Sequence, residues 1–128
     1  MELNQVTLPC VDYDASVAFY KALGLTQIVD SPSRYARFES STGSTLSIHS
    51  VESVADATGV TIYFEVEDVD AKIEELRDNG LRIDVEPVDQ SWLWREAKLS
   101  DPAGNVICIF HAGENRRHPP WRVNEIEL

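Results

Sequence analysis

The strongest constraint on the fold is an internal repeat. Residues 12–15 (Asp-Tyr-Asp-Ala) correspond to residues 68–71 (Asp-Val-Asp-Ala), and Gly24-Leu25 corresponds to Gly80-Leu81, in each case 56 positions later. A second match follows once the second copy has gained five more residues than the first: residues 43–48 then correspond to residues 104–109. Chance similarity rarely preserves a helix start, a helix end and a turn in one order. The sequence therefore predicts two copies of one structural unit laid end to end.

Each copy has the pattern of a strand, a helix and three further strands. The β-branched runs at 6–11 and 61–66 predict the first strand of each unit. A helix over 15–23 follows Asp12 or Asp14 as N-cap and ends at Gly24, and a second helix follows Asp68 and ends at Gly80. The later strands are expected near 26–29, 35–39 and 45–49, and near 82–85, 94–99 and 106–110. The predicted fold class is α+β, with two tandem β-α-β-β-β modules forming a curved mixed sheet around a cleft.

Strict alternation along a strand assigns each residue to one face of the sheet. The helix-facing positions should be Val6, Leu8, Leu46, Ile48, Ile62, Phe64, Ile107 and Ile109. The opposite face should then carry Gln5, Thr7, Ser47, His49, Thr61, Tyr63, Glu65, Cys108 and Phe110. Because this second set mixes polar and aromatic side chains, it suits the lining of a ligand cleft better than a dry core.

Composition narrows the possible partners. The chain has 128 residues, 43% of them hydrophobic, which fits one globular domain. Its net charge of −11 opposes binding to nucleic acid, since phosphate neutralisation needs a basic surface.

No apolar run is long enough to span a membrane and no signal segment is recognisable, so we expect a cytoplasmic protein. We expect one domain over residues 1–113, with halves of about 1–55 and 56–113, and a C-terminal tail over 114–128.

Two motifs in this order are similar to a known family. The helix string at 12–25, which ends in Phe19-Tyr20 and Leu23-Gly24-Leu25, and the later Asp-Pro-Ala-Gly-Asn turn at 101–105 with its following strand, resemble the glyoxalase/bleomycin resistance/dioxygenase superfamily, the vicinal oxygen chelate fold. The resemblance covers roughly residues 3–112 and implies the same duplicated fold. It also implies a homodimer with a small-molecule cleft.

The resemblance implies positions for a divalent metal as well. Enzymes of the glyoxalase branch take their ligands from the first and last strands of each half, and those positions here are Gln5, Ser47, Thr61 and Cys108. Only Gln5 matches the branch's His or Gln, Glu, His, Glu pattern. Because hydroxyls are poor ligands for a catalytic dication, we expect no metal cofactor. The alternative is a rearranged metal site built from Gln5, His49, Glu65 and Cys108.

Trp92 and Trp94 precede the second turn and add aromatic candidates for ligand stacking, with packing as the alternative role. The leading hypothesis is a metal-independent protein that binds a small organic molecule, of the resistance or sequestration kind. A lyase, isomerase or dioxygenase with an altered metal site is the second hypothesis. A structural module with a vestigial cleft is the third.

Overall fold

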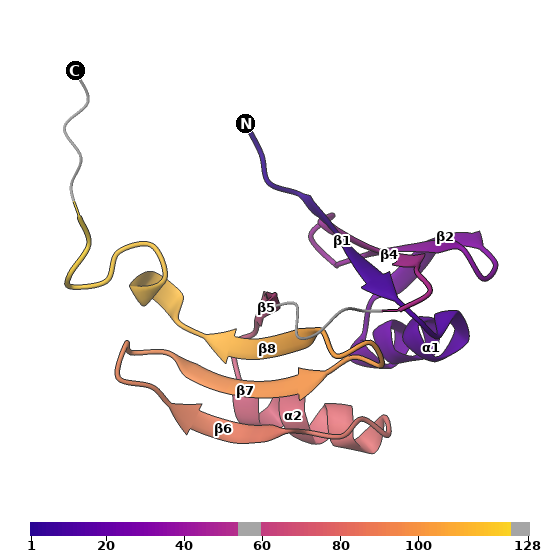
Figure 1. Ribbon diagram of the computed structural model, residues 1–128. Coiled ribbons are helices and arrows are strands. Elements are labelled where there is room, and N and C mark those ends of the chain that lie inside the picture. Colours follow the sequence, from indigo (N-terminus) through magenta and orange to yellow (C-terminus); the bar gives the residue numbers. More distant parts are fainter. Residues whose placement is uncertain (54–59, 124–128) are drawn as a thin grey trace.

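The computed structural model describes residues 1–53 and 60–123, and its elements follow the repeat (Figure 1). The first half contains β1 (Gln5–Cys10), α1 (Tyr13–Leu23), β2 (Thr26–Ser31), β3 (Tyr35–Glu39) and β4 (Thr45–Ser50). The second half contains β5 (Thr61–Glu65), α2 (Val69–Asp78), β6 (Val85–Asp89), β7 (Arg95–Ser100), β8 (Val106–His111) and the 3₁₀ turn η1 (Gly113–Asn115). The predicted β-α-β-β-β duplication is confirmed.

Each half folds into a four-stranded mixed sheet with one helix on one face. The strand orders are β1-β4-β3-β2 and β5-β8-β7-β6, with the outer pair of each sheet, β1 with β4 and β5 with β8, running parallel. The edge strands β1 and β5 do not pair with each other, so the chain forms two sheets rather than one continuous sheet. We call these the N-terminal and C-terminal sheets, and the face of each that is turned away from the helices its open face.

The helix starts show how closely the two halves agree. Asp12 and Asp68 have backbone angles of φ −125°, ψ 97° and φ −127°, ψ 99°. Each carboxylate accepts a hydrogen bond at 3.0 Å from the backbone N–H three residues later, at Ala15 and Ala71. Asp12, rather than Asp14, is therefore the N-cap of the first helix.

One core joins the halves through the helix-facing sides of both sheets. All eight predicted helix-facing residues belong to this core cluster or pack against it. Polar contacts also cross between the halves: the Tyr20 hydroxyl donates to Asp101 at 2.6 Å, and Asn79 Nδ2 donates to the carbonyl of Ala22 at 2.9 Å. The core thus fixes the angle at which the two open faces meet.

The strand expected near 82–85 is wrong, because the strand lies at Val85–Asp89. Leu81 and Ile83 instead pack against the core cluster, and the first backbone contact with β7 is the hydrogen bond from the Asp84 N–H to the Lys98 carbonyl at 2.9 Å. Pro87 is tolerated within β6 because β6 is an edge strand, where a missing N–H costs no ladder hydrogen bond. Neither described helix, at 11 and 10 residues, is long and apolar enough to cross a membrane.

Candidate ligand cleft and open faces

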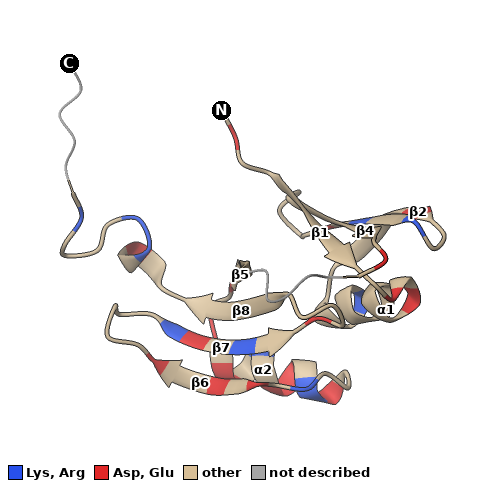
Figure 2. Ribbon diagram, viewed as in Figure 1, with Lys and Arg blue, Asp and Glu red and all other residues tan. Residues whose placement is uncertain are grey.

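A cleft of about 980 Å³ lies along the seam between the unpaired edges of the two sheets. Its walls come from both halves and include Gln5, Leu25, Thr45, Tyr63, Glu65 and Phe110. The charged strands lie elsewhere: acidic side chains are spread over α1, α2 and β6, whereas β1 and β8 carry no Asp, Glu, Lys or Arg (Figure 2). The cleft is therefore bordered by the uncharged strand β1 on one side, and its charged lining residues are Glu65 of β5, Lys72 and Arg116.

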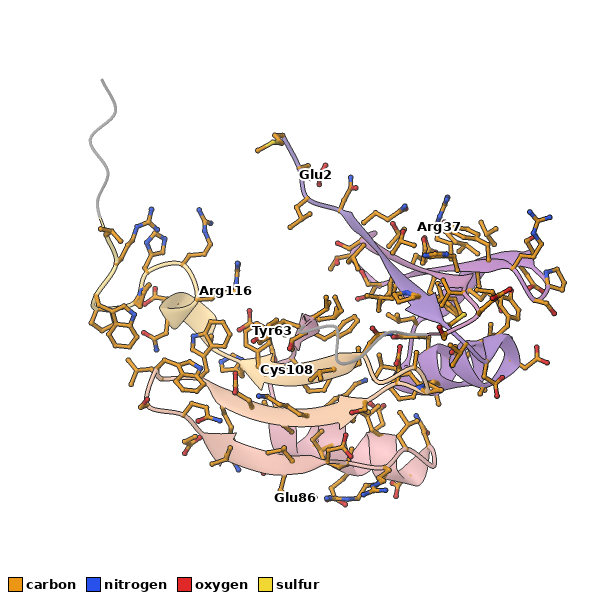
Figure 3. All side chains as sticks on the ribbon, in the orientation of Figure 1. Glu2, Arg37, Tyr63, Glu86, Cys108 and Arg116 are labelled. Atoms are coloured by element: carbon orange, nitrogen blue, oxygen red, sulfur yellow. The ribbon has the colours of Figure 1, made fainter. Side chains whose placement is uncertain are left out.

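Three aromatic rings on the open face of the C-terminal sheet form what we call the aromatic cluster: Tyr63, Trp94 and Phe110. Trp94 stacks on Phe110 with ring centroids 4.6 Å apart and an interplanar angle of 20°. Tyr63 meets both rings edge-on, at 5.7 Å from Phe110 and 6.1 Å from Trp94. Tyr63 is 51% exposed, so its ring remains accessible at the cleft wall (Figure 3).

A buried acid lies beside the aromatic cluster. Glu96 pairs across the sheet with Phe110 and is only 3% exposed. Its carboxylate contacts the thiol of Cys108, whose pKa is raised to about 12 by burial and then by the negative charge of Glu96. Within residues 1–53 and 60–123, Glu96 makes no ion pair, and the nearest basic residue on its face of β7 is Lys98, whose charge acts on the same Cys108 thiol.

Glu65 has a structural role at the rim of the cleft. Its Oε2 accepts hydrogen bonds from the backbone N–H groups of Ala112 at 2.8 Å and Gly113 at 2.9 Å, and Arg116 lies 3.6 Å from Oε1. Burial opposes ionisation, but these donors and the nearby charges of His111 and Arg116 lower the pKa of Glu65 below its ordinary value. The carboxylate therefore fastens the segment after β8 to the C-terminal sheet.

The open face of the N-terminal sheet carries a different chemistry. The Tyr35 hydroxyl lies 2.7 Å from Ser47 Oγ, and Arg37 Nε donates to the same phenol oxygen at 2.9 Å. The hydrogen bond with Ser47 lowers the pKa of Tyr35, burial opposes this, and the Arg37 donor and charge lower it further. Ser47 itself is fully buried, so it supports Tyr35 rather than lining the cleft.

The structure separates the predicted site residues into groups. Gln5, Tyr63, Glu65 and Phe110 line the cleft, whereas Thr7, Ser47, His49, Thr61, Trp92, Trp94 and Cys108 do not. Trp92 lies in the turn between β6 and β7, where Leu93 adopts φ 68°, so strand alternation does not place Trp92 beside Trp94. His49 is exposed near the end of β4, and Ser47 and Cys108 are buried beneath their neighbours.

The positions where related enzymes hold a metal do not suit a dication here. Gln5 Oε1 accepts a hydrogen bond from the Thr45 hydroxyl at 2.8 Å, and the Ser47 hydroxyl is engaged by Tyr35. A thiol with a pKa near 12 supplies almost no thiolate at neutral pH. These donors lack the carboxylates and imidazoles that hold a catalytic metal ion.

The rearranged set of Gln5, His49, Glu65 and Cys108 is not brought together either. His49 pairs with Pro9, four residues along β1 from Gln5, which corresponds to roughly 13 Å along the strand. Among the described residues, no three His, Cys, Asp or Glu side chains lie close enough to hold a metal ion.

Sequence reasoning missed three residues of these open faces: Tyr35, Arg37 and Glu96. The signal was present in the alternation, because Tyr35 and Arg37 flank the buried Ala36 and Glu96 precedes the buried Ala97. Alternation along β3 and β7, the third strands of the two units, places all three side chains on the open faces.

Comparison with known proteins is consistent with this architecture. The model of the glyoxalase/bleomycin resistance protein/dioxygenase superfamily matches residues 2–109. The uncharacterized protein YraH of Bacillus subtilis (strain 168) is 32% identical over 127 residues, covering 86% of this chain and 98% of that protein.

Two solved structures illustrate the likeness of the fold. A glyoxalase/bleomycin resistance protein/dioxygenase from Nocardioides superposes with a TM-score of 0.76 at 24% identity, over 97% of this chain and 90% of that one. A bleomycin-binding protein in complex with bleomycin superposes with a TM-score of 0.70 at 19% identity, over 87% of this chain and 98% of that one. At these identities the likeness concerns the fold.

Proposed function

The chain belongs to the glyoxalase/bleomycin resistance protein/dioxygenase superfamily, and we propose that it binds a small planar organic molecule at its cleft without the metal that related enzymes use. The single observation that carries this proposal is the aromatic cluster, which presents the half-exposed ring of Tyr63 at the cleft wall. Rigid aromatic side chains bind flat ligands with little loss of conformational freedom, so a preformed cluster favours stacking.

The chemistry around the cluster favours a ligand that carries hydrogen-bond donors or a positive charge. Burying a carboxylate is costly unless it gains donors or an opposite charge, and Glu96, which forms no ion pair in the described residues, lies beside Trp94 and Phe110. A cation near an aromatic face gains a further attraction from the ring. The net charge of −11 adds a long-range preference for cations over anions at this sheet.

The metal-free part of the proposal rests on the donors. Buried Ser47 and Cys108, together with an amide at Gln5, offer a weak ligand set, and a buried thiol with a raised pKa resists deprotonation. Metal analysis of protein purified without chelator tests this directly. Less than about one tenth of an equivalent of any transition metal is expected, and a stoichiometric metal that disappears in Gln5→Ala would refute it.

We further propose that the protein acts as a homodimer in the cytoplasm. One edge of β1 and one edge of β5 are unpaired in the described residues, and the exposed apolar side chains of Val88 and Leu93 leave surface that a second copy would cover. Both cysteines are free thiols, as a reducing compartment permits. Light scattering during size-exclusion chromatography tests the dimer, and a monomeric mass at micromolar concentration would refute it.

The binding experiment uses a single-tryptophan background. Trp92→Phe and Trp121→Phe leave Trp94, which contacts both other rings of the cluster, as the only tryptophan. Bleomycin, which one protein of the same fold binds, is the first probe, followed by a library of aromatic amines and guanidines. Binding should change Trp94 fluorescence and raise the unfolding midpoint, because a ligand of the native state stabilises it by mass action.

The matched variants separate the cluster from other surface aromatics. Tyr63→Leu should weaken binding by about tenfold or more, since it removes the accessible stacking surface. Tyr13→Phe is the control, because Tyr13 contacts Asp30 and the carbonyl of Tyr35 away from the cluster. Unchanged fluorescence and midpoint across bleomycin and the library would overturn the proposed function.

A further inference from the structure

The open face of the N-terminal sheet contains an arginine whose charge is not balanced. The chain has 22 acidic and 11 basic Lys and Arg residues, so acidic partners are abundant. Arg77, Arg95 and Arg116 all make ion pairs with carboxylates. In the described part of the chain Arg37 makes none, although Glu39 follows two residues later on the same strand; Arg34, Arg117 and Arg122 also make none, but they lie in a turn and in the segment after η1 rather than on a sheet face.

The structure holds this arginine in a defined orientation. Its Nε donates to the Tyr35 hydroxyl at 2.9 Å, and its guanidinium carbon lies 5.5 Å from the centre of the Tyr35 ring. The Tyr35 hydroxyl is anchored in turn by the buried Ser47 at 2.7 Å. With Nε engaged, the two terminal nitrogens still carry four N–H donors in a planar fork.

The strand register places the group on the side of the sheet that faces away from α1. Arg37 pairs with Ser47, and Ser47 pairs with Thr7, so the three residues form one row across β3, β4 and β1. His49 pairs with Tyr35 in the next row and is exposed. Figure 3 shows Arg37 on this side of the N-terminal sheet, whereas Glu86 lies on the far side of the C-terminal sheet.

We propose that Arg37, Tyr35 and Ser47 form a binding site for an oxyanion, a carboxylate or phosphoryl group of a small molecule. A guanidinium fork recognises two oxygens of such a group at once, and charge-assisted hydrogen bonds are the strong ones. The Tyr35 and Ser47 hydroxyls hold the fork in place before the anion arrives, which lowers the cost of binding. We call these three residues the anion site.

The anion site goes beyond the proposed function. It lies on the N-terminal sheet, none of its residues lines the cleft, and its ligand has the opposite charge from the one that Glu96 favours. The two proposals can therefore fail separately. If Tyr63→Leu loses bleomycin binding but keeps the phosphate response, the result concerns the cleft alone. If Arg37→Gln loses the phosphate response but keeps bleomycin binding, the result concerns the anion site alone.

The experiment is a titration of the full chain with inorganic phosphate and, separately, with benzoate, followed by ¹H–¹⁵N NMR. Both probes should move the Nε–Hε signal of Arg37 and the backbone amide signals of Tyr35 and Ser47. In Arg37→Gln, which has no Nε–Hε, the response of these two amides should weaken by about tenfold or more, as expected for the loss of a charge-assisted pair. Arg34→Gln is the matched control, because Arg34 is an exposed arginine of the preceding turn and should leave the response unchanged. Arg37→Lys keeps the charge but loses the fork and should bind several-fold more weakly.

A second readout is the ionisation of Tyr35, followed by ultraviolet absorbance and assigned by subtracting Tyr35→Phe. A bound anion beside the phenol opposes the phenolate, so phosphate should move this ionisation to higher pH. Ser47→Ala, which removes one anchor and a small volume, should reduce both the phosphate response and this shift. Overlap of the remaining NMR signals with those of the unaltered protein establishes that each variant is folded.

The outcomes are decisive in both directions. A response to phosphate alone identifies a phosphoryl site, a response to benzoate alone identifies a carboxylate site, and each supports the proposal. No movement of the Arg37 signal with either probe overturns it. An equal response in Arg37→Gln also overturns it, as does conversion of a dimer to a monomer by that variant, which would make Arg37 an interface residue.

Discussion

The two halves share a backbone but use it for different chemistry. The turns at 40–44 and 101–105 have the same hydrogen bonds: residue 40 or 101 donates to the carbonyl four residues later, at 2.8 and 2.9 Å, and Gly43 and Gly104 adopt φ 92° and 88°. The side chains within these turns differ. The Ser40 hydroxyl lies 3.2 Å from the Thr42 hydroxyl, whereas the Asp101 carboxylate accepts from Ala103, Asn105 and Tyr20.

Two equivalent places between the halves are what we call seams: the closed seam, where α1 contacts the turn at 101–105, and the open seam, where α2 lies opposite the turn at 40–44. Tyr20 on α1 reaches the turn at 101–105, but its repeat counterpart on α2 is Leu76, which has no hydroxyl to offer the turn at 40–44. The turn at 40–44 lines the cleft instead. A duplicated fold thus obtains a rigid joint and a binding cleft from equivalent positions by changing a few polar side chains.

The largest expected effect comes from breaking the closed seam. Asp101→Ala removes the acceptor of several buried hydrogen bonds and should lower the free energy of unfolding by about 3 kcal/mol. Tyr20→Phe removes one of them and should cost about 1–2 kcal/mol. Urea denaturation measures both, and Ser40→Ala at the equivalent position should cost about 0.5 kcal/mol or less. Equal losses at Ser40 and Asp101 would contradict the asymmetry of the seams.

The caps should behave alike in the two halves. Because Asp12 and Asp68 have the same geometry, Asp12→Ala and Asp68→Ala should each lower the free energy of unfolding by about 1 kcal/mol. Asp14→Ala, in the first turn of α1 but without a cap hydrogen bond, should cost only a few tenths of that. A loss confined to one cap, measured by the same denaturation, would show that the repeat is not energetically symmetric.

The smallest effect concerns acid pH and comes from Glu65, whose repeat counterpart in the first half is Pro9. Glu65 has a folded-state pKa below its unfolded value of about 4.3, so its contribution is present above that pH and disappears as pH falls through the folded pKa. Because the side chain is 32% exposed, the contribution should be below about 1 kcal/mol. Unfolding curves at stepwise lower pH should show a steeper loss in the unaltered protein than in Glu65→Gln. Parallel curves for the two would assign the acid sensitivity elsewhere.

Much of the architecture follows from local patterns in the sequence. The N-caps, the helix at Tyr13–Leu23 and the strand at Tyr35–Glu39 depend on residues close to each other along the chain, as did the assignment of core positions. The strand at Val85–Asp89 was misplaced because Leu81 and Ile83 have strand-forming character yet pack into the core from an irregular segment. Such a choice is made by tertiary packing, which no local pattern reports.

The site depended on tertiary structure to a greater degree. Alternation placed Tyr63, Cys108 and Phe110 on one face, but it could not tell that Cys108 would be covered while Tyr63 stayed accessible. That outcome depends on the volume of the neighbouring rings and on how far side chains lean along the sheet, as Tyr35 leans towards Ser47. Both are properties of contacts between strands.

By itself, the sequence determined the repeat, the element order and the face of most strand residues, because each follows from spacing along the chain. Only the tertiary structure decided that β1 and β5 remain separate edges with a cleft between them. It also decided which acids and bases find partners; Glu96 and Arg37, on the two open faces, are among the described residues that form no ion pair. The physical reason is that burial and charge balance arise where distant segments meet, and spacing along the chain does not encode those distances.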